Sequence, residues 1–191
     1  MILSYSKLAG LIWIIFFAYW YLSSAFNQAR TERQESNFSR LFYIVLIGLA
    51  VFLFSFGPAS YGPLLWRFVP DGTLSSQLGL AILVLGLCFA VWARLHLGRY
   101  WSGRISVAED HQLIQTGPYR LVRNPIYFGG LIAVLGTAII IGEVRAIPAF
   151  LLVLIALLYK IHLEEKLLKE RFAQGFTDYQ KKVKSLIPFV Y

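Results

Sequence analysis

The sequence is poor in charged residues, which make up 15% of its 191 positions, whereas soluble domains carry roughly 25%. Hydrophobic residues make up 58% and aromatic residues 16%. These are more apolar side chains than the core of a soluble protein of this length would bury. Its single cysteine, Cys88, lies in an apolar stretch, so a disulfide framework is excluded. The composition therefore argues against a soluble or disulfide-stapled domain.

Several sequence motifs of soluble enzymes are also missing. There is no G-x-G-x-x-G after a strand and no P-loop, which excludes the usual dinucleotide and phosphate-binding domains. The histidines His96, His111 and His162 lack the short spacing of a zinc site, so no metal is expected. The net charge of +8 could suggest nucleic acid, but the basic residues flank long apolar runs. Orientation in a membrane accounts for them better, and no nucleic-acid partner is expected.

Five stretches contain no Asp, Glu, Lys or Arg, and they are the candidates for membrane-spanning helices. They are residues 8–29, 41–66, 72–93, 124–142 and 146–159. A spanning helix needs about 20 largely apolar residues, so we predict an all-α, polytopic membrane bundle of about five helices. The first stretch is longer than the apolar region of a signal peptide, and we interpret it as a retained helix. The fifth would rise only about 21 Å, which leaves a tilted or re-entrant helix as the alternative.

The basic residues predict an orientation for this bundle. With five spans, fifteen of the eighteen Lys and Arg fall in residues 27–40, 94–123 and the tail from Lys160. Only Lys7, Arg67 and Arg145 fall on the other side. The positive-inside rule then places the N-terminus outside and the C-terminus in the cytosol. We expect the protein in the cytoplasmic membrane of a prokaryote.

Small residues recur in two of the predicted helices. In the fourth they are Gly129, Gly130, Ala133, Gly136 and Thr137, and in the third they are Gly79 and Gly86. Small residues let helices approach closely in lipid. We therefore interpret both sets as packing features and not as a site.

The first polar segment on the cytosolic side runs from Arg94 to Tyr127. Gly117-Pro118 predicts a turn, and Asn124-Pro125 predicts the start of the fourth helix, since proline is tolerated in the first turn. A helix N-terminus at the membrane surface offers free N–H groups to a carboxylate, and Arg123 adds a bidentate donor. Alternatively, Arg120 and Arg123 only anchor the chain to phosphate headgroups.

The second polar segment is the tail from Tyr159. Its apolar stripe, consisting of Leu163, Leu167, Leu168 and Phe172, predicts an amphipathic helix on the surface or capping the bundle. Glu164 and Glu165 follow the membrane end of the fifth helix, one turn after Lys160, where ionisable groups are costly unless buried in protein or used. The alternative is a solvated helix start.

These two segments together resemble a known family. The pattern G-P-Y-R-x-x-R-N-P-x-Y-x-G, a helical hairpin, E-E-x-x-L and a closing aromatic repeat is similar to the isoprenylcysteine carboxyl methyltransferases and their prokaryotic relatives. The residues that carry the pattern are Gly117, Pro118, Tyr119, Arg120, Arg123, Pro125, Tyr127, Gly129, Glu164, Glu165, Leu168, Phe172, Phe176 and Tyr179, with Pro188 near the end. The resemblance covers roughly residues 94–191 of a single domain, 1–191, whose residues 1–93 supply the first membrane helices.

The resemblance implies an enzyme that binds S-adenosylmethionine in a cytosolic pocket and methylates a lipophilic acceptor entering from the bilayer. The residues that would bind the cofactor are His111, Leu113, Gly117, Tyr119, Asn124, Pro125, Tyr127 and Glu164. Arg123, Glu165 and Lys160 are the catalytic candidates. An ionised carboxylate acceptor needs no general base, and Arg123 or Lys160 could orient it. An amine or thiol would need deprotonation, for which Glu164, Glu165 or His111 are the candidates.

The chain departs from the family pattern at three positions. Asn124 stands where the family usually has His, Lys160 where it often has Arg, and Ala173 where it often has Gly. An asparagine forms hydrogen bonds but does not titrate near neutrality, so it would not serve as a proton shuttle.

Alternatives to methylation of a prenylcysteine-like carboxylate therefore stay open. They are methylation of a phospholipid amine or a small thiol, a sterol-type NADPH-dependent membrane reductase, and a non-enzymatic membrane module. We expect a lipid-soluble or prenylated substrate and contact with membrane lipids; the sequence names neither the acceptor nor the oligomeric state.

Overall fold

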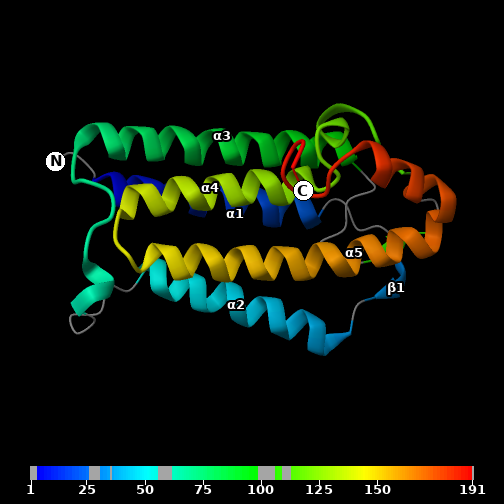
Figure 1. The fold of residues 1–191 in the computed structure, drawn as a ribbon, viewed down its shortest axis with the longest axis horizontal. Coiled ribbons are helices and arrows are strands. Elements are labelled where there is room, and N and C mark those ends of the chain that lie inside the picture. Colours follow the sequence, from blue (N-terminus) through cyan, green and yellow to red (C-terminus); the bar gives the residue numbers. More distant parts are fainter. Residues whose placement is uncertain are drawn as a thin grey trace.

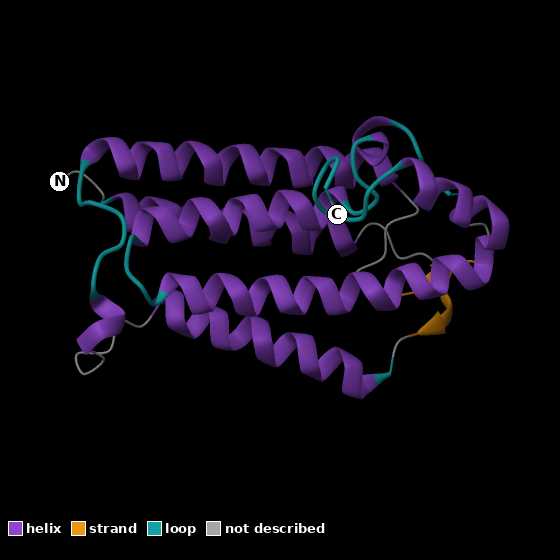
Figure 2. Cartoon of the chain, in the orientation of Figure 1, coloured by secondary structure: helices purple, strands orange, loops and turns teal. Residues whose placement is uncertain are grey.

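The structure is a computed structural model that describes residues 4–25, 31–34, 36–55, 62–98, 106–108 and 113–190. It contains helices α1 (Tyr5–Ala25), α2 (Asn37–Ser55), α3 (Thr73–Leu97), α4 (Pro125–Ile141) and α5 (Ala146–Lys182), with short 3₁₀ helices η1 (Gly62–Leu65) and η3 (Gly117–Arg120). Strands β1 (Thr31–Gln34) and β2 (Ser106–Ala108) form a small antiparallel pair at one end of the bundle (Figure 2). The predicted all-α membrane bundle is confirmed, with this pair as a minor addition.

The fourth helix begins at Pro125 as predicted, whereas the length of the last helix differs from the prediction. Helices α1, α2, α3 and α5 are long and apolar enough to cross a membrane, whereas α4 has 17 residues. The fifth helix was expected to be short, because its uncharged run covers only residues 146–159, but α5 has 37 residues. Its apolar run at residues 146–159 is followed by Leu, Lys and Glu, which are good helix formers, so the helix continues past the end of the apolar run. The protein is an integral membrane protein.

Helices α3 and α4 pack most closely, through the predicted glycines. A Cβ on Gly86 would lie 2.6 Å from the Gly129 carbonyl oxygen, and one on Gly136 would lie 2.5 Å from the Gly79 carbonyl oxygen. The contacting pairs are thus seven residues apart on both helices, as expected of antiparallel neighbours. A Cβ on Gly130 would meet nothing within 4 Å, so this glycine is not part of the interface.

The connections between helices fall at two opposite ends of the bundle. The α4–α5 turn lies at the same end as the N-terminus, and the polar connections α1–α2 and α3–α4 lie at the other (Figure 1). At the first end, Gly142 has the positive φ of a left-handed helix cap, and Arg145 donates to the Leu53 carbonyl at 2.7 Å, which caps α2. The basic segments of the sequence are thereby collected at the second end.

The chain folds back on itself near its C-terminus. Inside α5, Ala173 has φ 42° and ψ −111°, a conformation that favours glycine, and this is the position where the family often has Gly. The helix bends there and its last turns run back toward the start of α4 (Figure 1). Leu163 and Leu167 of the predicted apolar stripe pack beside Tyr43 and Ala156. The predicted amphipathic helix is therefore a continuation of α5 and not a separate element.

We expect Gly129→Ala to destabilise the bundle, because the new methyl group would press on backbone atoms of α3 that cannot move aside independently. Overpacking of this kind costs about 1–3 kcal/mol. The thermal unfolding midpoint in detergent measures the effect. Gly130→Ala, at the next residue and in open space, is the matched control and should leave the midpoint unchanged or slightly raised. Equal midpoints for the two variants would contradict the glycine contact.

Candidate functional site

The candidate site lies where the start of α4, the polar part of α5 and the C-terminal tail meet. The backbone N–H groups of Arg123 and Asn124 donate to the carbonyls of Lys184 and Ser185 at 2.8 and 3.0 Å. Leu186 is fully buried and packs in a cluster with Leu131 of α4 and Ile161 of α5. These contacts fix the tail against both helices.

Glu165 is the centre of a polar cluster in this region. Arg123 Nε and Nη2 donate to its two carboxylate oxygens at 3.0 and 2.9 Å, in a bidentate pair. The two side chains are only 10% and 15% exposed. A pair that is desolvated to this degree is costly to break, because the remaining charge is left buried without a partner.

Three further side chains donate to the same carboxylate. Asn124 Nδ2 and Ser185 Oγ reach Oε1 at 2.9 and 2.8 Å, and Gln180 Nε2 reaches Oε2 at 3.2 Å. Burial alone would raise the pKa of the Glu165 carboxyl, but the hydrogen bonds and the charge of Arg123 hold this pKa below its usual value. The side chain is therefore an anion that joins α4, α5 and the tail.

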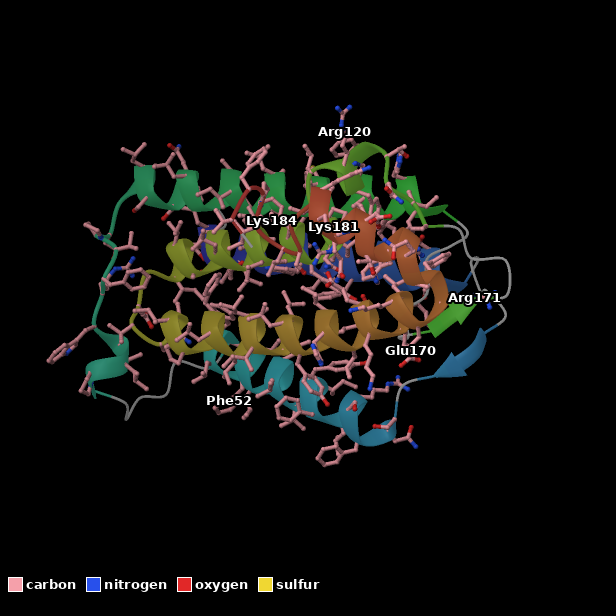
Figure 3. The ribbon with its side chains drawn as sticks, turned by 45° about the vertical axis from the view of Figure 1, so that its right-hand side comes forward. Phe52, Arg120, Glu170, Arg171, Lys181 and Lys184 are labelled. Carbon is pink, nitrogen blue, oxygen red and sulfur yellow. The ribbon has the colours of Figure 1, made fainter. Side chains whose placement is uncertain are left out.

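The two arginines of this segment, Arg123 and Arg120, lie in different environments. The Nη1 atom of Arg123 donates to the carbonyls of Val183 and Gln180, so its guanidinium faces the protein and is engaged on both sides. Arg120 instead projects away from the bundle (Figure 3) and is exposed. Of the two sequence interpretations, anchoring to headgroups fits Arg120, and a place within the site fits Arg123.

A second group of polar side chains lies on another face of α5. Tyr127 Oη donates to Glu164 Oε1 at 2.5 Å. The ammonium of Lys160 lies 5.2 Å from the ring centre of Tyr43 and 5.6 Å from that of Tyr127. A cation over aromatic faces gains more where water is excluded. This group, Tyr43, Tyr127, Lys160 and Glu164, joins helices α2, α4 and α5, and is called the tyrosine–lysine group below.

The turn at Gly117 packs against the end of α3. Gly117 has φ 58°, and a Cβ there would lie 2.7 Å from the His96 ring, so the position requires glycine on both grounds. Tyr119 is buried, and its Oη donates to the Ala93 carbonyl at 3.4 Å. The backbone carbonyl of Tyr119 in turn accepts a hydrogen bond from Tyr179 Oη. Burial raises the pKa of the Tyr119 phenol, which therefore stays protonated.

The predicted site residues thus fall into three places. Arg123, Asn124 and Glu165 are in the Glu165 cluster; Tyr127, Lys160 and Glu164 are in the tyrosine–lysine group; Gly117 and Tyr119 form the turn against α3. Pro125 is the buried first residue of α4, and Leu113 is in the irregular stretch before η3. His111 lies outside the described residues.

Sequence reasoning missed Tyr43, Gln180 and Ser185. Tyr43 sits near the start of an apolar helix, where a tyrosine is typical of the membrane interface, so no signal separated it from an ordinary anchor. Gln180 and Ser185 reach Glu165 only because the tail folds back at Ala173. Their positions in the sequence carry no pattern that would predict this contact.

A cleft of about 520 Å³ opens beside the Glu165 cluster. It is lined by Arg123, Leu158, Ile161, His162, Glu165, Lys166, Lys169, Gln180, Lys184, Ser185 and Val190. None of the tyrosine–lysine group is among these residues. The described part of the chain therefore offers two separate polar environments on either side of α5.

Comparisons with known proteins place the chain in a family. The family described as "Phospholipid methyltransferase" matches residues 74–175. A probable protein-S-isoprenylcysteine O-methyltransferase of Oryza sativa is 35% identical over 118 residues, which cover 60% of this chain and 62% of the relative. The cobalt-zinc-cadmium resistance protein CzcN of Cupriavidus metallidurans is 33% identical over 120 residues, which cover 62% of this chain and 53% of the relative.

A solved structure is similar as well. It is that of the eukaryotic intramembrane Ras methyltransferase ICMT (isoprenylcysteine carboxyl methyltransferase), with a TM-score of 0.54 and 26% identity, covering 82% of this chain and 54% of that one. The chain thus spans little more than half the length of these relatives. The family match covers more than half of the chain and includes α3, α4 and most of α5. The chain belongs to the phospholipid methyltransferase family, and its resemblance to the isoprenylcysteine carboxyl methyltransferases is confirmed.

Proposed function

We propose that this protein is an integral membrane methyltransferase that uses S-adenosylmethionine to methylate a lipophilic acceptor, most closely the carboxylate of a prenylcysteine-like group. The observation that carries this proposal is the tyrosine–lysine group, which collects two aromatic faces, a carboxylate and an ammonium beside the membrane end of α5. The proposed orientation has this end of the bundle in the cytosol and the N-terminus outside.

The side chains of this group suit S-adenosylmethionine, which supplies a methyl group already activated by its sulfonium charge. Glu164 offers a carboxylate to a cation, and Tyr43 and Tyr127 offer ring faces, which attract cations through their quadrupoles. The same environment already stabilises the ammonium of Lys160. The other proposed cofactor-binding residues are Asn124, Pro125, Leu113, Gly117 and Tyr119. His111, which lies outside the described residues, stays a prediction from the sequence.

Lys160 is the proposed partner of the acceptor. Its ammonium contacts two tyrosine rings and forms no ion pair with a described carboxylate, so it is able to receive an anionic group. An acceptor carboxylate is ionised at pH 7 and needs no general base. Lys160 would hold it in place while the surrounding helices exclude water, which leaves positioning as the main contribution of the protein.

Arg123 and Glu165 have a different role in this proposal. Each already has its hydrogen-bonding partners inside the protein, so neither is available to bind an acceptor without breaking the cluster. They act as positioning residues, because they hold the start of α4, with Asn124 and Tyr127, at a fixed place relative to Glu164. An anionic Glu165 held in this way is also unsuited to accept a proton from an amine or thiol.

The other candidate acceptors remain within the same proposal. The family description favours a phospholipid amine as the second candidate, and a small thiol is the third. A small thiol presents no carboxylate to Lys160, so substitution of Lys160 distinguishes it from the carboxylate. A phospholipid amine carries an anionic phosphate that could also pair with Lys160, so it is distinguished by direct assay of methyl transfer to phosphatidylethanolamine. A sterol-type reductase would bind NADPH, and a non-enzymatic membrane module would bind neither cofactor.

Ligand binding to the detergent-purified protein tests the cofactor. We expect S-adenosylhomocysteine, the product form of the cofactor, to bind with micromolar affinity in isothermal titration, and NADPH not to bind. Binding of NADPH alone would favour the reductase. Absence of both would leave the non-enzymatic module.

We expect Lys160→Met to lower the rate of methyl transfer to a carboxylate acceptor by about 10- to 100-fold, because one oriented charge pair is lost. The affinity for S-adenosylhomocysteine should change little. Lys160→Arg, which keeps the charge, is the matched control and should retain much of the activity. If the preferred acceptor is a small thiol, Lys160→Met should not lower the rate, and an unchanged rate would exclude the carboxylate.

We expect Glu165→Gln to lower both the stability of the protein and its methyl transfer, since the buried charge of Arg123 loses its partner. The cost of breaking such a pair is about 3–5 kcal/mol, measurable as a fall in the thermal unfolding midpoint. Arg123→Ala should act in the same direction. Asp178→Asn, on the same helix, is the control and should change little, because the ion pair that it removes, with Lys181, is exposed to solvent. Normal activity and stability of both Glu165→Gln and Arg123→Ala would remove the cluster from the mechanism.

A further inference from the structure

The cleft beside the Glu165 cluster is separate from the proposed catalytic group. At 100° per residue, the α5 side chains that line it, including Leu158, His162 and Lys169, project on the opposite side of the helix from Lys160 and Glu164. The proposed methyl transfer therefore leaves this cleft unused, and it needs an explanation of its own.

The lining of the cleft changes character along α5. Leu158 and Ile161 lie at the end of the apolar run of residues 146–159, whereas Lys166 and Lys169 lie about 12–17 Å further along the helix axis than Leu158. Lys184 adds a third ammonium from the tail (Figure 3). The cleft thus has apolar side chains beside the end of the apolar run and a cationic rim further along the helix.

The positive charge of the rim is not neutralised by the part of the chain that the structure describes. Arg123 is balanced by Glu165. Lys166, Lys169 and Lys184 are exposed and form no ion pair with a described carboxylate. Three ammonium groups therefore face one opening of about 520 Å³, whereas Glu165, the acidic residue of its lining, is already paired.

We propose that this cleft binds an anionic phospholipid of the surrounding bilayer, with the phosphate headgroup between Lys166, Lys169 and Lys184 and the upper acyl chain against Leu158 and Ile161. Basic pockets at the membrane surface attract anionic headgroups by about 1 kcal/mol per cation. A free phosphate would use the lysines but not the apolar end, and a neutral phospholipid would use the apolar end but not the lysines. The combination of both ends selects an anionic amphiphile.

Native mass spectrometry of the detergent-purified protein with phosphatidylglycerol or phosphatidylcholine tests this proposal without any methyl transfer. We expect a phosphatidylglycerol adduct that the double variant Lys166→Gln, Lys169→Gln binds at least tenfold more weakly, since each ammonium contributes roughly fivefold. The matched control is Lys181→Gln, Lys182→Gln, which removes the same charge from the same helix outside the cleft. It should bind phosphatidylglycerol like the wild type.

Several results would overturn the proposal. Equal loss of the adduct in both double variants would indicate a general charge effect, and equal binding of phosphatidylcholine would show that the lysines do not select. Displacement of the lipid by millimolar inorganic phosphate would indicate a free-anion site instead. Thermal unfolding midpoints of the variants separate a binding defect from misfolding. Because no cofactor or acceptor is present, failure here leaves the proposed methyl transfer unaffected, and the reverse is equally true.

Discussion

The ion pair between Arg123 and Glu165 is the interaction on which the rest of the polar end depends. It joins residues 42 positions apart and is reinforced by Asn124, Gln180 and Ser185, so the start of α4, the outer part of α5 and the tail are held by a single carboxylate. Near the bilayer, water cannot readily replace any of these donors. The cluster is therefore a constraint on the fold first, and it affects chemistry only by fixing the groups around it.

The Glu165 cluster lies between two polar faces of α5. One face carries Lys160 and Glu164 toward the tyrosines of α2 and α4, and the other lines a cationic cleft with the tail. Both faces belong to one helix that continues past its apolar run, so each of them changes from apolar to polar along the same stretch of α5. This arrangement gives a small protein two environments for amphiphilic ligands at the level of the headgroups.

The sequence predicted what depends on local spacing. The five apolar runs followed from composition, and the small residues of the third and fourth helices were recognised as packing features, but the sequence did not predict that these two helices pack against each other. It also identified Arg123 and Glu165 as candidates, but not that they pair with each other. That contact, like those of Gln180 and Ser185, depends on the bend at Ala173 and on the burial of Leu186. Such non-local features are set by tertiary packing, which no short pattern records.

The short length of α4 has a consequence for where the proposed acceptor would meet the protein. Its 17 residues rise only about 26 Å, which is less than the usual ~30 Å hydrocarbon thickness. This hydrophobic mismatch is relieved either by thinning of the adjacent bilayer or by immersion of the helix start below the headgroup plane. In both cases Asn124 and Tyr127 come nearer to the lipid tails than the ends of longer neighbours such as α3. A lipid-anchored acceptor would then reach these residues without withdrawing its anchor from the bilayer.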